Sequence, residues 1–250
     1  KVGAKAKWHG EGELVELKPV AIRGVESAGM ICASTEIGLG EMFPLKEEKE
    51  ILDLTNKVWV ENLQPLRPGT PLAKALGLDD AVLEIDNKSL SNRPDLWGHY
   101  GIAREAAVLF GKKLSAKGAS APDIKGGKDI KLEVKVEDVK LCPRYLAVAM
   151  SGIKVGPSPA WMQKSLSAVG LRPINNIVDI TNYIMMDLGQ PMHAFDYKQL
   201  TTNNKQLTIT VRTAKDGEEF TTLDGQKRKL DSSMLMITNG DKNLAIAGVM

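Results

Sequence analysis

Several polar side chains interrupt a segment that is otherwise apolar, and they are the first candidates for chemistry. Residues 177–188 are largely apolar and have the pattern of a helix, yet Asp179, Thr181 and Asn182 lie among them. A polar group in a buried element needs a hydrogen-bond partner or a functional reason. An imidazole, His193, follows shortly afterwards, and imidazole is the side chain that titrates near neutral pH. This stretch is therefore the first candidate for a catalytic or binding site.

The same stretch also has a structural interpretation, which stays open. A His close to Pro191 is more often a structural hydrogen-bonding group than a catalytic one. Asn175, Asn176 and Asp179 are typical of helix caps, because Asn and Asp commonly satisfy the free amides at the start of a helix. For these three residues we favour the capping role.

Other catalytic and cofactor-binding motifs are missing from the sequence. A Ser-His-Asp arrangement built on His193 and Asp196 would need a strained nucleophile turn such as Gly-x-Ser-x-Gly, which is absent. There is no Gly-rich phosphate loop with a Lys and no Cys/His set at metal-ligand spacing. Cys32 and Cys142 lie far apart and fit neither a disulfide framework nor a zinc site. We therefore expect no metal site. We also expect the protein to lie in the cytoplasm, where cysteines stay reduced.

The composition allows a folded chain with two domains of ordinary size. Its 250 residues are 43% hydrophobic and 26% charged, with a formal net charge of +2. That charge does not indicate nucleic acid by itself, so any RNA contact must come from local patches. No apolar run approaches the ~20 residues of a membrane helix, and no signal-peptide pattern opens the sequence. We expect no membrane association, and we expect both ends to be cuts within a longer protein.

The first part of the sequence has the pattern of a small barrel followed by mixed elements. Residues 18–32 alternate imperfectly and are broken by glycines, as in short, strongly bent strands. The stretch 112–128 is rich in Lys, Gly, Ala and Ser, which is typical of an exposed linker. Between them we expect loops and strands around 38–54, a helical turn over 71–77, a strand over 81–86 and an amphipathic helix over 99–110.

The second part predicts a domain of mixed helices and strands. Helices are expected over 159–169 and 177–188, and a hairpin with an Asp-Gly turn over 221–226. Antiparallel pairing is expected among the strands. These strands are predicted over 131–136, 144–150, 207–212, 234–238 and 245–250.

Three stretches carry recognisable motifs, and their order along the chain also matches one family. Residues 21–32 resemble the core motif of the OB-fold tRNA-binding domain of synthetases. Residues 86–105, with Asn-Arg-Pro-Asp at 92–95 and Gly-Ile-Ala-Arg-Glu at 101–105, look like the stretch that follows this module in the beta subunit of bacterial phenylalanyl-tRNA synthetases. Residues 170–196, from Gly-Leu-Arg-Pro to His-Ala-Phe-Asp, are similar to the editing-domain signature of that subunit. The resemblance covers essentially the whole chain.

Two departures from the family pattern are visible. Many members have Asn-Arg-Gly-Asp-Cys where this chain has Asn-Arg-Pro-Asp-Leu at 92–96. The family pattern also continues past Met250, with further glycines and a later acidic residue of the editing pocket.

The resemblance implies an α+β, multidomain fold. It implies a partial OB-fold tRNA-binding domain over 1–81, a connecting α/β segment with a linker over 82–128, and a C-terminally truncated editing domain over 129–250. It further implies that the chain supports aminoacylation of tRNA(Phe) by binding the tRNA, and that it hydrolyses mischarged tyrosyl-tRNA(Phe). The alternatives are a non-catalytic segment for structure and tRNA docking, and a stand-alone RNA-binding module.

The resemblance also assigns roles to particular residues of the editing site. His193 would orient a water or bind the terminal adenosine of the tRNA, and Thr181 and Asn182 would hydrogen-bond the substrate. Small residues that leave room for an aromatic ring would form a pocket wall, for which ordinary strand packing is the alternative. By the resemblance, the substrate-binding residues would be Pro191, Ala247 and Gly248.

Partners and cofactors follow from the same resemblance. Activation of phenylalanine, with ATP and magnesium, is expected on an alpha subunit within an α2β2 heterotetramer, so no cofactor is expected on this chain. Lys18 and Arg23 are the best candidates for contacts with the backbone of tRNA(Phe), since OB-type barrels present basic groups to nucleic acid. Solvated surface charge is the alternative for each of them.

Overall fold

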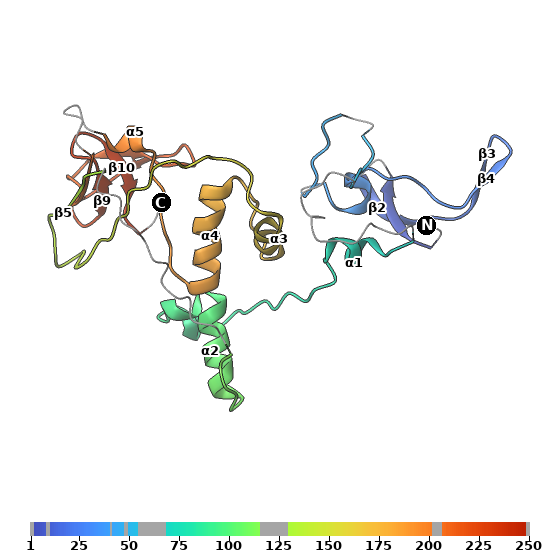
Figure 1. The fold of residues 1–250 in the computed structure, drawn as a ribbon, viewed down its shortest axis with the longest axis horizontal. Helices are drawn as coiled ribbons and strands as arrows, with labels where there is room; N and C mark the ends of the chain where they lie inside the picture. The colour runs from blue at the N-terminus through green and yellow to red at the C-terminus, as the bar shows by residue number, and fades with distance from the viewer. Residues whose placement is uncertain are drawn as a thin grey trace. The chain divides into compact units, whose positions relative to one another are not determined.

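The computed structural model describes residues 3–8, 11–40, 42–47, 50–54, 69–115, 130–201 and 207–248. The chain forms two compact units, each made of two stretches (Figure 1). One unit combines residues 1–113 with 155–192, and the other combines 114–154 with 193–250. The three domains expected from the sequence stay a prediction, because compactness alone does not mark where a domain begins. The linker expected over 112–128 lies mostly outside the described residues.

Two short antiparallel hairpins open the first unit. Their strands are β1 (Lys5–Trp8) with β2 (Glu11–Glu16), and β3 (Val20–Ile22) with β4 (Val25–Ser27). The turn between β3 and β4 places Arg23 and Gly24 at φ angles of 52° and 83°. Two consecutive positive φ angles are what the tightest hairpin turns require. The short, bent strands expected over 18–32 are thus confirmed, while the OB-fold barrel stays a prediction.

The helices of the first unit follow the apolar spacing of the sequence. α4 packs against both α2 and α3, and it carries the polar residues 179, 181 and 182. The helices expected over 71–77, 99–110, 159–169 and 177–188 are confirmed to within a residue or two at their ends. The structure has η1 (Thr35–Ile37), α1 (Leu72–Leu76), η3 (Lys88–Leu90), η4 (Pro94–Leu96), α2 (His99–Leu109), α3 (Ala160–Ala168) and α4 (Asn176–Leu188).

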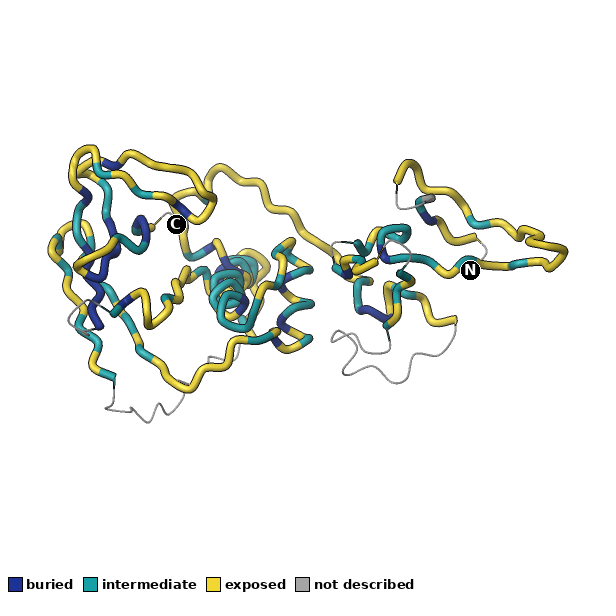
Figure 2. Tube along the Cα trace, turned by 90° about the horizontal axis from the view of Figure 1, so that it is seen from above, coloured by how far each residue is buried: buried dark blue, intermediate teal, exposed yellow. Residues whose placement is uncertain are grey.

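The strand expected over 81–86 is wrong. The segment is irregular and exposed throughout (Figure 2). Val82 and Leu83 are 79% and 85% exposed. A strand is stabilised by a ladder to a neighbour, and no described segment pairs with this one. Residues 51–54, where a strand was also expected, are irregular for the same reason.

The second unit is built on a four-stranded sheet in the order β10-β9-β6-β5. β5 and β6 run parallel, while β6–β9 and β9–β10 are antiparallel, so the expectation of antiparallel pairing is wrong for β5 alone. A separate hairpin, β7 with β8, has Asp224 and Gly225 at its turn, as the sequence predicts. The strands are β5 (Leu132–Val136), β6 (Leu207–Thr213), β7 (Glu219–Thr221), β8 (Lys227–Lys229), β9 (Leu235–Thr238) and β10 (Asn243–Ile246).

The core of the second unit lies along β6, β9 and β10, where buried residues gather in Figure 2. One cluster joins a short helix, α5 (Tyr197–Leu200), to the sheet through Leu200, Leu207, Ile209, Ile237 and Ala245, and we call it the sheet cluster. A second cluster consists of Ala214, Leu230, Met236 and Ile246.

The segment 144–150, expected to be a strand, is not one. Tyr145, Ala147 and Ala149 pack against the sheet cluster, while Leu146 and Val148 are exposed. Side chains of this segment thus alternate between the core and solvent, although no described strand forms a ladder with it. A period of two predicts which side faces the core but not whether a hydrogen-bonding partner is present.

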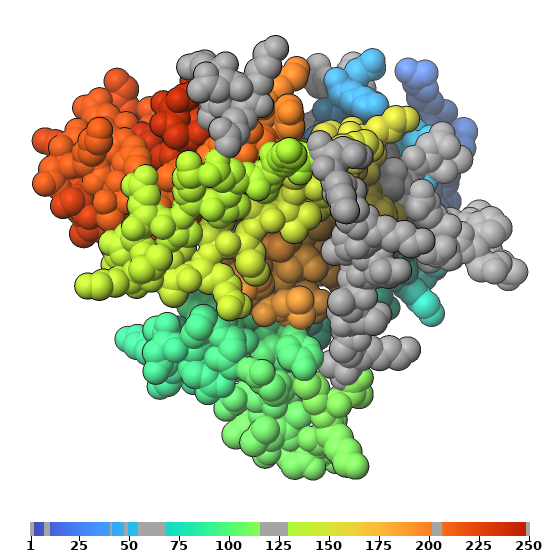
Figure 3. Space-filling model, turned by 60° about the vertical axis from the view of Figure 1, so that its left-hand side comes forward, coloured from blue at the N-terminus to red at the C-terminus, as the bar shows by residue number. Residues whose placement is uncertain are grey.

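Three consecutive apolar side chains are exposed where α2 ends. Val108, Leu109 and Phe110 are exposed by 74–75%, and this end of α2 stands at the surface in light green in Figure 3. None of the helices in the described ranges is long and apolar enough to cross a membrane.

Candidate functional site

The start of α4 is held by polar side chains. The side chain of Asn175 accepts hydrogen bonds from the backbone N–H groups of Ile177 and Val178, at 3.0 and 3.1 Å. Asp179 is 1% exposed, and its carboxylate accepts from the Ser158 hydroxyl at 2.5 Å and from the Ile174 N–H at 2.8 Å. The capping role favoured from the sequence is confirmed for Asn175. Asp179 instead ties the segments before and after α3 to α4.

Thr181 and Asn182, one turn further along α4, differ in their freedom to bind. The Thr181 hydroxyl donates to the Val178 carbonyl of its own helix at 2.7 Å, which leaves only its lone pairs for a ligand. The half-buried Asn182 amide has no hydrogen-bond partner among the described residues. Asn182 is therefore the better placed of the two to bind a substrate.

His193 lies on the surface of the second unit. Its ring is exposed and stacks on Phe195, with ring centroids 6.1 Å apart and an angle of 27° between the planes. Phe195 packs in turn against the sheet cluster. The imidazole thus has a fixed neighbour on one face and solvent around it. Pro191, also exposed, belongs to the first unit together with Thr181 and Asn182.

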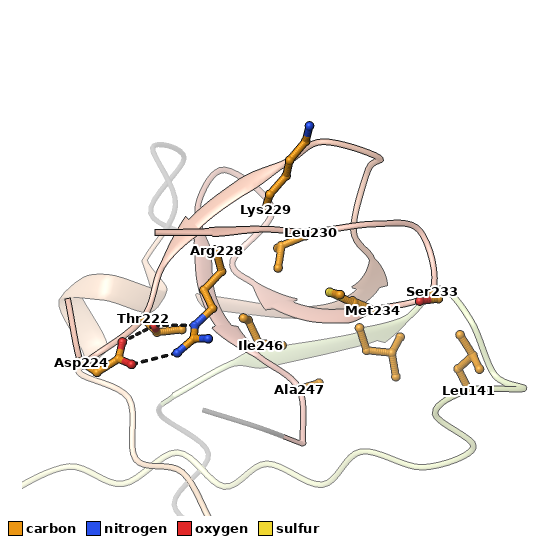
Figure 4. Close-up of a pocket in the computed structure, with 11 residues that line it drawn as sticks. Leu141, Thr222, Asp224, Arg228, Lys229, Leu230, Ser233, Met234, Ile246 and Ala247 are labelled. Carbon is orange, nitrogen blue, oxygen red and sulfur yellow. Dashed lines mark hydrogen bonds and ion pairs between the residues drawn. The ribbon is translucent and has the colours of Figure 1, made fainter. Parts of the chain in front are cut away.

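Ala247 lines a pocket of about 610 Å³ in the second unit (Figure 4). This volume is in the range of pockets that hold small molecules. The wall is mostly apolar, with Leu141, Met234 and Ile246 beside Ala247. Ala247 also packs against the sheet cluster, so it joins the pocket to the surface on which Phe195 lies. Gly248 follows it, exposed and with a φ of 78°.

Three polar side chains form one rim of this pocket. Arg228 reaches from β8 to Asp224, with Nη2 and Oδ2 2.9 Å apart, and the Thr222 hydroxyl donates to the same carboxylate (Figure 4). The hydrogen bond from Thr222, then the Gln226 N–H and Arg228, hold the pKa of Asp224 below its usual value. The carboxylate is therefore an anion at neutral pH and is already paired.

The rim was not identified as a site from the sequence, where Thr222, Asp224 and Gly225 indicate only a hairpin turn. The signal that could have found it is Asp224 with Arg228 four positions later across the turn. No set of three or more His, Cys, Asp or Glu side chains in the described ranges could hold a metal ion.

A second polar cluster, away from the pocket, braces β6. Arg212 donates to both carboxylate oxygens of Glu218, at 3.0 and 2.6 Å, and to the Asn243 side chain at 2.8 Å. The hydrogen bond from Arg212, then those from the Lys215 N–H and the Asn243 amide, lower the pKa of Glu218 to about 2.

This pKa predicts how stability depends on pH. Because the pKa of Glu218 falls on folding from 4.5 to about 2, its contribution is fully present above pH 4.5 and is lost as the pH drops toward 2. In Glu218→Gln the free energy of unfolding should therefore fall less between about pH 6 and about pH 3 than in the parent. Urea unfolding at the two pH values measures this, with Glu219→Gln, its exposed neighbour, as the control. If the free energy of unfolding fell by the same amount between these pH values in the parent and in Glu218→Gln, the prediction would be contradicted.

Lys18 and Arg23 lie in the first unit and are both exposed. Arg23 stands at the tip of the β3–β4 hairpin, where its positive φ places it outside the strands. Both side chains are free to reach a phosphate backbone, which is compatible with RNA contact and equally with solvated charge.

Comparison with known proteins adds the family. Residues 141–250 match the model of the B3/4 domain. The chain is 47% identical to the phenylalanine–tRNA ligase beta subunit of Clostridium acetobutylicum, 44% to that of Geobacter sulfurreducens and 41% to that of Synechocystis sp.. Each match covers 94% of this chain, which spans 28% of the first relative and 27% of the other two. The chain belongs to the phenylalanine–tRNA ligase beta subunit family and corresponds to a part of such a subunit that includes B3/4 domain sequence.

Proposed function

We propose that the chain is the tRNA-binding and editing part of a phenylalanine–tRNA ligase, and that it hydrolyses tyrosyl-tRNA(Phe). One observation supports this most. Phe195, on which His193 stacks, and Ala247 pack against the same sheet cluster although they are far apart in sequence. Both residues also lie within the B3/4 match. Two of the residues expected in the editing site are therefore attached to one rigid surface.

The need for such a site follows from the size of the specificity problem. Tyrosine differs from phenylalanine by one hydroxyl, and an apolar pocket rejects an isostere with an added hydroxyl by only about a hundredfold. A second, hydrolytic site corrects the remaining errors. An ester already has a reasonable leaving group, so a positioned water and hydrogen bonds to the carbonyl can suffice without a protein nucleophile.

The residues of the site take separate roles in this proposal. The exposed ring of His193, fixed on one face by Phe195, orients the water or binds the terminal adenosine. The free amide of Asn182 donates to the substrate, and Thr181 can only accept, because its proton is already used. Pro191, Ala247 and Gly248 shape the space for the aromatic ring.

The remaining functions belong to the complete enzyme. Lys18 and Arg23 contact the backbone of tRNA(Phe), and an alpha subunit in an α2β2 assembly binds ATP and magnesium and activates phenylalanine. The alternative is a segment that only docks tRNA. The exposed β3–β4 hairpin favours that role, because Val20, Ile22 and Val25 are more than half exposed around Arg23.

The proposal is tested by incubating the chain, and the complete alpha/beta enzyme in parallel, with tyrosyl-tRNA(Phe) and following the release of tyrosine. Release by both supports an editing site made of residues present here. Release by the complete enzyme alone means that further residues are required. Release by neither overturns the editing proposal and leaves tRNA docking, for which binding that weakens steeply with salt is the expected sign.

A further inference from the structure

The end of α4 meets the start of α2 backbone to backbone, in what we call the α2–α4 joint. Gly98, which precedes α2, is buried, and a Cβ added there would lie 2.3 Å from the Gly189 nitrogen and 2.8 Å from the Leu188 carbonyl carbon. Gly189 ends α4 with a φ of 73°, and a Cβ on it would lie 3.2 Å from the Pro94 carbonyl oxygen. Both positions therefore need glycine, one for space and the other mainly for its backbone conformation.

A directional hydrogen bond completes the joint. The Nδ1 of His99 lies 2.8 Å from the Met186 carbonyl oxygen, and the ring must donate because a carbonyl only accepts. Met186 is in the last turn of α4, where carbonyl groups have no partner within the helix. The neighbouring Met185 carbonyl already accepts from the Gly189 N–H at 2.9 Å. Two successive carbonyls at this end of α4 are thus satisfied, one of them by α2.

The α2 side of the joint is itself braced. Arg93 donates to both oxygens of Asp95 at 2.9 Å and to Glu105 at 3.1 Å, while Arg104 donates to Asp95 at 2.7 Å. Gly101 allows α2 to lie against η4, since a Cβ there would be 1.5 Å from the Asp95 carbonyl oxygen. Forked, charge-assisted hydrogen bonds of this kind fix geometry. η4 and α2 therefore act as one piece that holds α4.

We propose that the α2–α4 joint positions the part of the editing site that α4 carries, with Gly98 and His99 as positioning residues that do not touch substrate. This inference rests on the proposed function. α4 carries Thr181 and Asn182, and Pro191 follows its last residue by three positions within the same unit. With its start capped and its end in the joint, α4 cannot slide or turn. Misplacement of reacting groups by about 1 Å can slow a reaction by about a hundredfold.

The test places the same substitution at the two ends of α4. Gly98→Ala introduces the clash with Gly189, whereas Gly156→Ala does not, because no atom lies within 4 Å of its added Cβ and its φ is not positive. Gly156 still touches α4, since its N–H donates to the Asn176 side chain. In the complete enzyme we expect Gly98→Ala to lower kcat for tyrosyl-tRNA(Phe) hydrolysis at least tenfold at nearly unchanged KM. Gly156→Ala should match the parent.

A second pair of variants keeps the inference testable if Gly98→Ala does not fold. His99→Ala removes the bond to Met186 and should lower kcat, whereas His99→Asn retains an N–H donor near the Nδ1 position and should restore most of it. Equal losses in the two variants would overturn the role of this bond.

Hydrogen exchange separates this inference from the proposed function. Backbone amides of residues 187–190 should exchange faster in Gly98→Ala and His99→Ala than in the parent, and not in Gly156→Ala. If the parent enzyme hydrolyses no tyrosyl-tRNA, the proposed function falls, while exchange still decides whether the joint holds this segment. Parent-like exchange and parent-like kcat in Gly98→Ala would overturn the joint as a positioning device.

Discussion

Replacing His193 with alanine is expected to slow the release of tyrosine from tyrosyl-tRNA(Phe) by about a hundredfold. The ring is exposed and its only stacking contact among the described residues is with Phe195, so removing it takes away a group that can orient water but little buried surface. The free energy of unfolding should therefore stay within about 0.5 kcal/mol of the parent, as for surface substitutions in general. Single-turnover hydrolysis with the complete enzyme, beside urea unfolding of the same variant, measures both.

Lys198→Ala is the matched control for this prediction. Lys198 is exposed, lies in the same segment and uses its backbone N–H, not its side chain, to contact Asp196. Its loss should leave hydrolysis unchanged. Retention of parent activity by His193→Ala would remove His193 from the site and favour the tRNA-docking role.

The largest loss of stability is expected from Asp179→Ala. The carboxylate is 1% exposed and is the acceptor for the Ser158 hydroxyl and the Ile174 N–H. The Ser158 hydroxyl is buried and the Ile174 N–H lies in a part-buried position. Each donor left without a partner costs about 1–3 kcal/mol, so the total loss should be about 2–6 kcal/mol. Denaturant unfolding followed by circular dichroism gives this value.

Two variants on the same helix sharpen this prediction. Asp179→Asn keeps an acceptor for the Ile174 N–H and should lose about 1 kcal/mol. Asp187→Ala removes a carboxylate near the C-terminal end of α4, where a negative charge is unfavourable to the helix dipole, and should be neutral or slightly stabilising. A loss in Asp179→Ala no larger than in Asp187→Ala would show that the buried hydrogen bonds contribute little.

The helices were predictable because their signals are local. α4 has apolar spacing, a cap at Asn175 and a glycine at its end, all within a few residues. Strands depend on a partner elsewhere in the chain, which is why the apolar run at 81–86 is irregular and the alternating run at 144–150 has no ladder. The parallel pairing of β5 with β6 could not be foreseen for the same reason.

Residues of the candidate site could be predicted from the sequence only where they belong to a family motif. Ala247 came from the resemblance and does line a pocket, and its role there stays a prediction. The rim formed by Thr222, Asp224 and Arg228 was missed, because a hairpin turn explains the same residues. The need for glycine at position 98 depends on the backbone of Gly189, which no local pattern reveals.

The parallel ladder between β5 and β6 also sets an order of events during synthesis on the ribosome. β5 emerges first, but the residues between it and β6 include 155–192, which belong to the other unit. At roughly 5–20 residues per second, β5 waits several seconds for its neighbour. All residues of the first unit have by then been made. A nascent chain that has exposed β5 but not yet β6 therefore presents an unpaired strand edge, which is open to pairing with another chain.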